Sequence, residues 1–142
     1  MASINFFTED IFFNLKNKNA VRKWLNFVIT NEQHSLLQLN YIFCSDTFLL
    51  DINTSYLNHN YFTDVITFDN ASFSDTIEGD IFISIDRINE NFLSFNTSFD
   101  HELSRVIVHG LLHLLGYNDS TPEQISIIRQ KENYYLSLFF PS

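Results

Sequence analysis

The chain has 142 residues and a formal net charge of −9, and 45% of its residues are hydrophobic, including 16 phenylalanines. This length and apolar content suit a single folded domain with a substantial core, and they exclude an intrinsically disordered chain. The acidic charge argues against a general nucleic-acid binder, because affinity for phosphate groups comes mainly from lysine and arginine.

The first half of the chain predicts two strands and two helices. Alternating residues indicate a short strand at Ile4–Phe6, and apolar residues at helical spacing indicate a helix over residues 17–30. A partly alternating run indicates a second strand over residues 36–44. Residue 45 is a serine suited to an N-cap, so a short helix is expected over residues 45–53.

Half of the basic residues lie at the start of the first predicted helix. Four of the eight lysines and arginines fall in one short stretch, namely Lys16, Lys18, Arg22 and Lys23. A solvated helix surface is the ordinary interpretation of such a stretch. A patch that contacts phosphate groups is the alternative, and the sequence leaves both open.

The second half predicts two strands and three helices. Two β-rich runs, Val65–Phe68 and Gly79–Ile85, are expected to form neighbouring strands joined by a polar segment. Helices are expected over residues 86–95, 100–115 and 122–138. Asp100 is placed to cap the second of these helices, and a Thr121–Gln124 capping box followed by proline starts the third.

The helix over residues 100–115 carries two separate stripes. The first is apolar, with Gly110 beside it to let a neighbouring element approach, and consists of Leu103, Val106, Ile107, Leu111 and Leu114. The second carries His109 and His113 together with Glu102. The apolar stripe is expected to face the core, which leaves the histidines on another face.

These histidines begin a metal-binding pattern, His-x3-His-x5-Asp, that consists of His109, His113 and Asp119. Two histidines four residues apart on a helix can reach one metal ion, and Gly116 allows the chain to turn after the helix. Three protein ligands with one open position are typical of catalytic zinc. In zinc peptidases a glutamate that acts as general base follows the first histidine, and here that position is Gly110.

Several nearby residues have ordinary interpretations as well. Asp119 is of a type that favours turns and N-caps. His101 lies two helical turns before His109, too far to share a metal ion, and His34 and His59 are expected on the surface or in loops.

Four further residues have more than one interpretation. Glu102 is either an outer partner of the ligands or, as we expect, a solvated carboxylate in the first helical turn. Asp64 and Asp80 flank the predicted strands and can serve simply to close turns. Tyr117 can orient a ligand or pack. No side chain near the pattern is an obvious general base, so that role stays open.

The signature His109-Gly110-x-Leu112-His113-Leu114-x-Gly116-Tyr117 resembles that of the YbeY family of rRNA-maturation endoribonucleases. Two further segments are similar in order and spacing: Asn53 with Thr63–Phe68, and Gly79–Ser84. The final helix, with Arg129 and Glu132, also fits. The combination is far more specific than the histidine spacing alone.

The resemblance implies an α+β fold in which a small mixed β-sheet packs against several helices, with the metal site on a helix. It implies one Zn²⁺ per chain, held by His109, His113 and Asp119. It further implies metal-dependent cleavage of single-stranded RNA in rRNA maturation, at the 3′ end of small-subunit rRNA, and in ribosome quality control. The implied partners are single-stranded RNA or rRNA and the ribosome or ribosomal proteins.

The chain departs from the family pattern at two positions. The usual signature ends in a third histidine, and Asp119 occupies that ligand position here. An aspartate is a legitimate zinc ligand, but its charge reduces the net charge of the metal. Leu57 stands where the family usually has an arginine thought to assist catalysis, and a leucine cannot hold a phosphate group.

Two other functions stay open at this point. A metallopeptidase-like hydrolase would need Asp64 or Glu102 to replace the missing base. A non-catalytic ribosome assembly factor with a structural metal is favoured somewhat by Leu57 and by the acidic charge. A basic groove leading to the histidines would favour RNA cleavage.

Location is predicted from what the sequence lacks. The single cysteine, Cys44, excludes an internal disulfide and a cysteine-based zinc site, as expected in a reducing compartment. No apolar run of about 18 residues is present, and the acidic first residues do not form a secretion signal. We therefore expect a cytoplasmic protein with no membrane partner.

Overall fold

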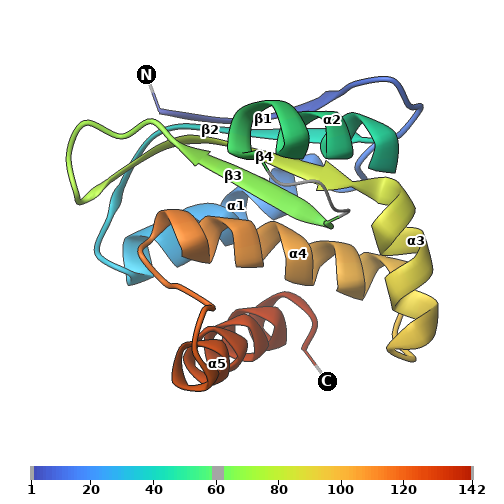
Figure 1. The fold of residues 1–142 in the computed structure, drawn as a ribbon. Coiled ribbons are helices and arrows are strands. Elements are labelled where there is room, and N and C mark those ends of the chain that lie inside the picture. Colours follow the sequence, from blue (N-terminus) through green and yellow to red (C-terminus); the bar gives the residue numbers. More distant parts are fainter. Residues whose placement is uncertain (1, 59–62, 142) are drawn as a thin grey trace.

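A computed structural model describes residues 2–58 and 63–141 of the chain. The strands are β1 (Ser3–Thr8), β2 (Ser35–Cys44), β3 (Val65–Asp69) and β4 (Thr76–Ser84) (Figure 1). The helices are α1 (Lys18–Asn31), α2 (Asp46–Leu57), α3 (Ile85–Ser94), α4 (Phe99–Leu114) and α5 (Pro122–Phe139). Each strand and helix expected from the sequence is present. No helix within the described ranges combines the length and apolar character needed to cross a membrane.

The four strands form one mixed sheet in the order β1-β2-β4-β3. β2 pairs in parallel with β1 and with β4, whereas β3 pairs antiparallel to β4. The short connection between β3 and β4 permits the antiparallel pair, and the long connections through α1 and α2 permit the parallel ones. The α+β fold with a small mixed sheet is therefore confirmed.

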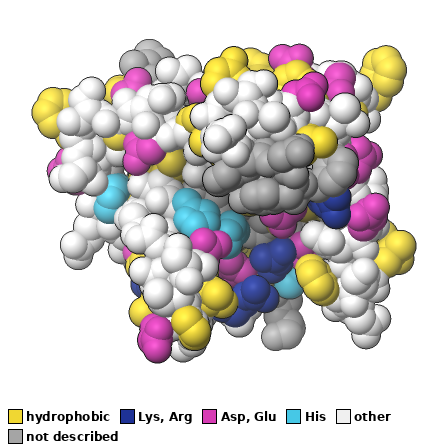
Figure 2. Space-filling view, viewed as in Figure 1, with side chains coloured by type: hydrophobic (Ala, Val, Ile, Leu, Met, Phe, Trp, Pro, Cys, Tyr) yellow, Lys and Arg dark blue, Asp and Glu magenta, His cyan; other side chains and the backbone are white. Residues whose placement is uncertain are grey.

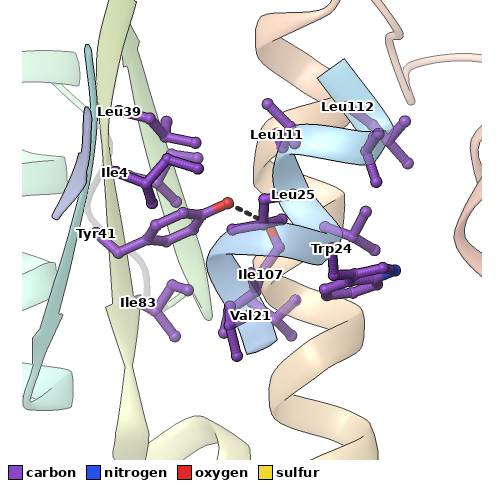
Figure 3. Close-up of a cluster of buried hydrophobic side chains, with 14 of the residues drawn as sticks. Ile4, Val21, Trp24, Leu25, Leu39, Tyr41, Ile83, Ile107, Leu111 and Leu112 are labelled. Carbon is purple, nitrogen blue, oxygen red and sulfur yellow. Dashed lines mark hydrogen bonds between the residues drawn. The ribbon is translucent and has the colours of Figure 1, made fainter. Parts of the chain in front are cut away.

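Helices cover both faces of this sheet. α1 and α4 lie on one face, α2 lies on the other, and α5 packs against α4 on the side away from the sheet (Figure 1). The main core lies between the sheet and helices α1 and α4 (Figure 3). Within it, the hydroxyl of Tyr41 in β2 donates a hydrogen bond of 2.8 Å to the carbonyl oxygen of Ile107 in α4. The predicted apolar stripe of α4 is buried in this core. Because this stripe faces the core, the face of α4 that carries His109 and His113 is the one that reaches the surface.

The N-terminus of α4 differs from the prediction in one respect. Ser98 is the N-cap, and its hydroxyl accepts a hydrogen bond from the backbone N–H of His101. The prediction that Asp100 caps the helix is wrong. Asp100 lies in the first turn instead, where a carboxylate interacts favourably with the helix dipole.

Two glycines allow α4 to approach the sheet closely. A Cβ atom at Gly110 would lie 2.8 Å from Cγ2 of Ile81 in β4, so the expected close approach at this position is confirmed. A Cβ atom at Gly79 would lie 2.6 Å from the carbonyl oxygen of Phe68 and 3.1 Å from Cδ1 of Leu114. The obstacle at Gly79 includes the backbone of the neighbouring strand, which cannot rotate away.

Gly79→Ala is therefore expected to destabilise the protein by roughly 1–3 kcal/mol, the usual range for overpacking in a filled core. Chemical denaturation measures this change in the free energy of unfolding. Gln38→Ala, at an exposed position of β2, is the matched control and is expected to stay within about 0.5 kcal/mol of the parent. Equal stability of the two variants would show that β3 and β4 move apart at Gly79 to accommodate the added methyl group at no cost in stability.

Candidate metal centre

The last turns of α4 present two histidines to the surface. His109 and His113 lie one helical turn apart, and their Nε2 atoms are 3.0 Å from each other. Both side chains are partly exposed, in contrast to the buried stripe on the opposite side of the helix. The predicted pairing of these two residues at one point on the surface is therefore confirmed.

A turn after α4 brings the third predicted residue back to the histidines. The N–H of Gly116 donates to the carbonyl of His113, and the N–H of Tyr117 donates to that of Leu112, each at 3.0 Å. These two bonds form a Schellman motif, and Gly116 has the positive φ of 105° that it requires. Oδ2 of Asp119 then lies 3.6 Å from Nε2 of His109 and 3.4 Å from Nε2 of His113.

The other ring nitrogens have hydrogen-bond partners that assign the tautomers. Nδ1 of His109 lies 2.5 Å from Oε2 of Glu132, and Nδ1 of His113 lies 2.9 Å from the backbone oxygen of Tyr117. Both partners only accept hydrogen bonds, so both Nδ1 atoms carry the proton. In the neutral rings both Nε2 atoms then present a lone pair to each other and to Asp119.

The Nε2 atoms of His109 and His113 and Oδ2 of Asp119 are spaced as the ligands of one metal ion would be. Converging lone pairs and a carboxylate oxygen repel one another unless a cation or a proton lies between them. Ligands about 2.0–2.1 Å from a tetrahedral zinc are separated by roughly 3.3 Å, and the three separations given above lie close to this value. Within the described residues, His109, His113 and Asp119 form the one group of three or more such side chains that could hold a metal.

A cavity of about 370 Å³ opens directly onto these atoms. Its walls are the end of α2, β3 with the two residues before it, the two histidines and Asp119, and the lining residues include Asn53, Leu57, Thr63 and Asp64. Two of the three segments that carried the family resemblance therefore line this cavity, whereas none of its lining residues belongs to the third, Gly79–Ser84. Leu57 lies at the wall, 39% exposed, so its substitution for the usual arginine falls within reach of a bound ligand.

Behind the histidines lies a buried network of charged side chains. Arg105 donates to both oxygens of Glu102, at 2.9 and 2.6 Å, and to Oε1 of Glu132 at 3.3 Å. Both carboxylates are almost completely buried. The prediction that Glu102 is a solvated carboxylate is wrong: it is held inside the protein by Arg105, one helical turn along α4.

The charges of this network shift the pKa values of its members. Burial would raise the pKa of Glu132, but the hydrogen bond from His109 and the positive charges around it, including Arg105, lower the pKa overall. Burial would likewise lower the pKa of Arg105, but its hydrogen bonds to Glu102 and both negative charges raise it. Glu132 is therefore an anion, and Arg105 a cation, at neutral pH.

A second network supports the turn that carries Asp119. Glu32, which follows α1, accepts hydrogen bonds from the hydroxyls of Tyr117 and Tyr135 and from Nζ of Lys131. Burial would raise the pKa of Glu32, but these three donors lower it. Tyr117 therefore has two contacts: its backbone oxygen accepts a hydrogen bond from Nδ1 of His113, and its hydroxyl donates to Glu32, which joins the turn to the end of α1.

Of the remaining candidates within the described residues, only Asp64 lies at the cavity beside His109, His113 and Asp119. His101 lies against the ring of Phe140, with centroids 5.2 Å apart, and His34 bonds to the backbone oxygen of Glu32. Asp80 accepts a hydrogen bond from Asn40, and only Asp64 of the strand-flanking acids lines the cavity. His59 and the predicted loop around it fall largely outside the described residues.

The basic stretch at the start of α1 does not line the cavity. Lys16, Lys18 and Lys23 are exposed, whereas Arg22 donates to the carbonyl oxygen of Ile4 and to the side chain of Asn19. The phosphate-contacting interpretation of this stretch stays a prediction. Other basic side chains do adjoin the metal centre: Figure 2 shows lysine or arginine side chains next to the histidines and acids of this face.

Sequence reasoning missed the contact between His109 and Glu132. A signal for it exists in α5, because Glu132 occupies the buried stripe of that helix with Ile128, Tyr135 and Leu136. A carboxylate on an apolar stripe needs a buried partner. Arg105 and His109, spaced four apart on α4, are such partners, but the sequence does not show that α5 packs there.

The chain is similar to known proteins over almost its whole length. The family model described as "Endoribonuclease YbeY" matches residues 3–139. The chain is 48% identical over 136 residues to an Endoribonuclease YbeY of Cytophaga hutchinsonii, covering 96% of this chain and 95% of the relative. It is 42% identical over 139 residues to that of Flavobacterium johnsoniae, covering 98% and 97% of the two chains.

A solved structure is also similar. The solution structure of TM1509 from Thermotoga maritima superposes with a TM-score of 0.67 over 95% of this chain and 87% of that one. The two sequences are 24% identical, so this likeness supports the fold alone.

Proposed function

This chain belongs to the YbeY endoribonuclease family, and from this premise we propose that it is a metal-dependent endoribonuclease that acts in rRNA maturation. The observation that carries the activity is the match of the family model to nearly the whole chain, together with relatives that share close to half of its residues. The convergence of three acceptor atoms at the mouth of the cavity supports the metal dependence.

We propose zinc as the metal and His109, His113 and Asp119 as its ligands. Nitrogen and carboxylate donors of this kind suit zinc, and three protein ligands leave a position open for substrate. When bound, such an ion polarises a phosphate oxygen and lowers the pKa of a water molecule. The residues of the chain supply the rest: Glu132 and the oxygen of Tyr117 orient the two rings, and the cavity wall receives the RNA.

The substrate is proposed to be single-stranded RNA, specifically the 3′ end of small-subunit rRNA, in association with the ribosome. The cavity is open to the surface, as an RNA strand requires, and basic side chains lie next to the histidines and acids on the face of Figure 2. Arg129, whose side chain is 59% exposed, has its Nε 3.7 Å from Oε1 of Glu132, the carboxylate that contacts His109. A cytoplasmic location fits this role and stays a prediction.

The two alternatives have less support. A metallopeptidase would need a base in place of Gly110, and Glu102 cannot serve because it is buried against Arg105. The family match and the relatives also name an endoribonuclease. A structural metal in a non-catalytic assembly factor would be expected to have four protein ligands, and this group has three.

One assay separates these functions. The zinc-loaded protein is incubated with single-stranded RNA and with casein, each with and without a chelator. We expect cleavage of RNA that the chelator abolishes and that added zinc restores, and no cleavage of casein. Cleavage of casein would favour the peptidase, and the absence of cleavage in both substrates would favour the assembly factor.

Replacement of Asp119 tests the third ligand. Asp119→Ala is expected to weaken zinc binding by more than about 100-fold, because loss of an outer partner of a ligand alone costs about 10- to 100-fold. Asp119→His restores a metal ligand and is expected to retain zinc. Asp100→Ala, an exposed acid on α4, is the control and should bind zinc as the parent does. Zinc titration against a competing chelator measures all four proteins, and parental affinity in Asp119→Ala would remove Asp119 from the ligand set.

A further inference from the structure

We propose that Glu132 is a positioning residue of the metal centre: its carboxylate, anchored by Arg105, fixes the tautomer and the orientation of His109. The inference rests on the metal site of the proposed function. It adds a residue from α5 to a site whose three ligands all come from α4 and the turn that follows.

The contacts of Glu132 are divided between its two oxygens. Oε2 lies 2.5 Å from Nδ1 of His109, whereas Oε1 lies 3.3 Å from Nη1 of Arg105 and 3.7 Å from Nε of Arg129. The side chain is 1% exposed, so water does not compete for these contacts. One oxygen is therefore given to the histidine and the other to the arginines, and the carboxylate cannot turn without losing both.

Arg105 determines where this carboxylate lies. Its guanidinium forms two hydrogen bonds with Glu102 on its own helix and a third with Glu132 on α5. Glu102, Arg105 and His109 are spaced three and four residues apart, so they follow one line along α4. Glu132 of α5 inserts between Arg105 and His109, so the charged and polar groups follow in the order Glu102, Arg105, Glu132, His109. These contacts of Glu132 hold α5 in place against His109.

The hydrogen bond to Glu132 has a direct effect on His109 as a ligand. A carboxylate that accepts from Nδ1 places the proton there, leaves the lone pair on Nε2, and increases the donor strength of the ring. His113 obtains the same tautomer from a neutral backbone oxygen, that of Tyr117. The two histidines therefore differ, and only His109 depends on a charged residue of another helix.

Substitutions at Glu132 test this role through metal binding rather than activity. Glu132→Gln keeps the size of the side chain but loses its charge, and its amide can donate to Nδ1 and so favour the wrong tautomer. Glu132→Ala removes the contact entirely. We expect the zinc affinity to fall about 10- to 100-fold in Glu132→Gln, and at least as much in Glu132→Ala, as for other partners of ligating histidines.

Ile128→Val is the matched control. It removes one methyl group from the same buried face of α5, one turn before Glu132, and is expected to lower the melting temperature of the metal-free protein without changing its zinc affinity. The visible spectrum of the cobalt-loaded protein provides a second readout. It should change in Glu132→Gln, because the donor strength of His109 changes, and should stay the same in Ile128→Val.

The outcomes distinguish this inference from the proposed function. Parental zinc affinity and an unchanged cobalt spectrum in Glu132→Gln would overturn the positioning role while leaving the metal site intact. A parent protein that binds neither zinc nor cobalt would instead overturn the metal site itself. Weakened binding in Glu132→Gln together with parental binding in Ile128→Val is the result that the structure predicts.

Discussion

Combined replacement of His109 and His113 by alanine is expected to abolish zinc binding and to reduce cleavage of single-stranded RNA by at least about 1,000-fold. The two side chains provide both nitrogen donors of the proposed site, and a bound metal contributes several kcal/mol to the stabilisation of a reacting phosphate. Elemental analysis and a single-stranded RNA cleavage assay measure the two losses. Full metal content in this variant would contradict the assignment.

The same variant is expected to stay folded. Both histidines lie at the mouth of the cavity and outside the buried apolar cluster, so their removal leaves no large void in the core. The parent with zinc should melt above both the variant and the metal-free parent, because a ligand that binds the native state stabilises it by mass action. His101→Ala, on the same helix but away from the cavity, is the control and should retain zinc and activity.

Arg105→Ala is expected to destabilise the protein by about 3–5 kcal/mol, the usual cost of leaving buried charges without a partner. Glu102 and Glu132 would both lose a guanidinium that lies within hydrogen-bonding distance of each. Denaturation of the metal-free protein measures the effect separately from metal binding. Arg105→Lys keeps the charge but not the paired hydrogen bonds to Glu102, and is expected to fall between Arg105→Ala and the parent.

Arg87→Ala is the matched control for this prediction. Arg87 also forms an ion pair, with 3.0 Å between its Nε and Oδ1 of Asp46, but its side chain is 30% exposed. Exposed pairs of this kind contribute about 0–1 kcal/mol. Similar losses of stability in Arg105→Ala and Arg87→Ala would show that the buried network is no stronger than a surface contact.

The order of elements could be predicted because each one carries a local signal. The buried stripe of α4, the glycine that ends it and the capping box of α5 are all properties of short stretches, and all three are present as expected. The N-cap of α4 is predicted at Asp100 but lies two residues earlier, at Ser98, because serine and aspartate are both good caps. Local rules therefore predict the elements more reliably than their first residue.

The proximity of the three proposed metal ligands could be predicted for the same reason, and their surroundings could not. His109, His113 and Asp119 lie within eleven residues, and helix geometry alone brings the first two together. Glu132 reaches His109 from another helix, a contact that depends on how α5 packs. The burial of Glu102 is of the same kind, because a charged residue is expected in water until its buried partner is known.

The sheet and the metal centre also differ in when they are synthesised. All four strands precede residue 85, and even the pairing of β2 with β4 joins segments that leave the ribosome well before His109. The proposed ligands, on α4 and the turn after it, and then Glu132, on α5, follow last. We therefore expect the sheet with α1 and α2 to collapse first, and the ion to enter only after α5 has docked. Zinc would then complete an already folded domain, unlike in a zinc finger, where binding the metal drives folding.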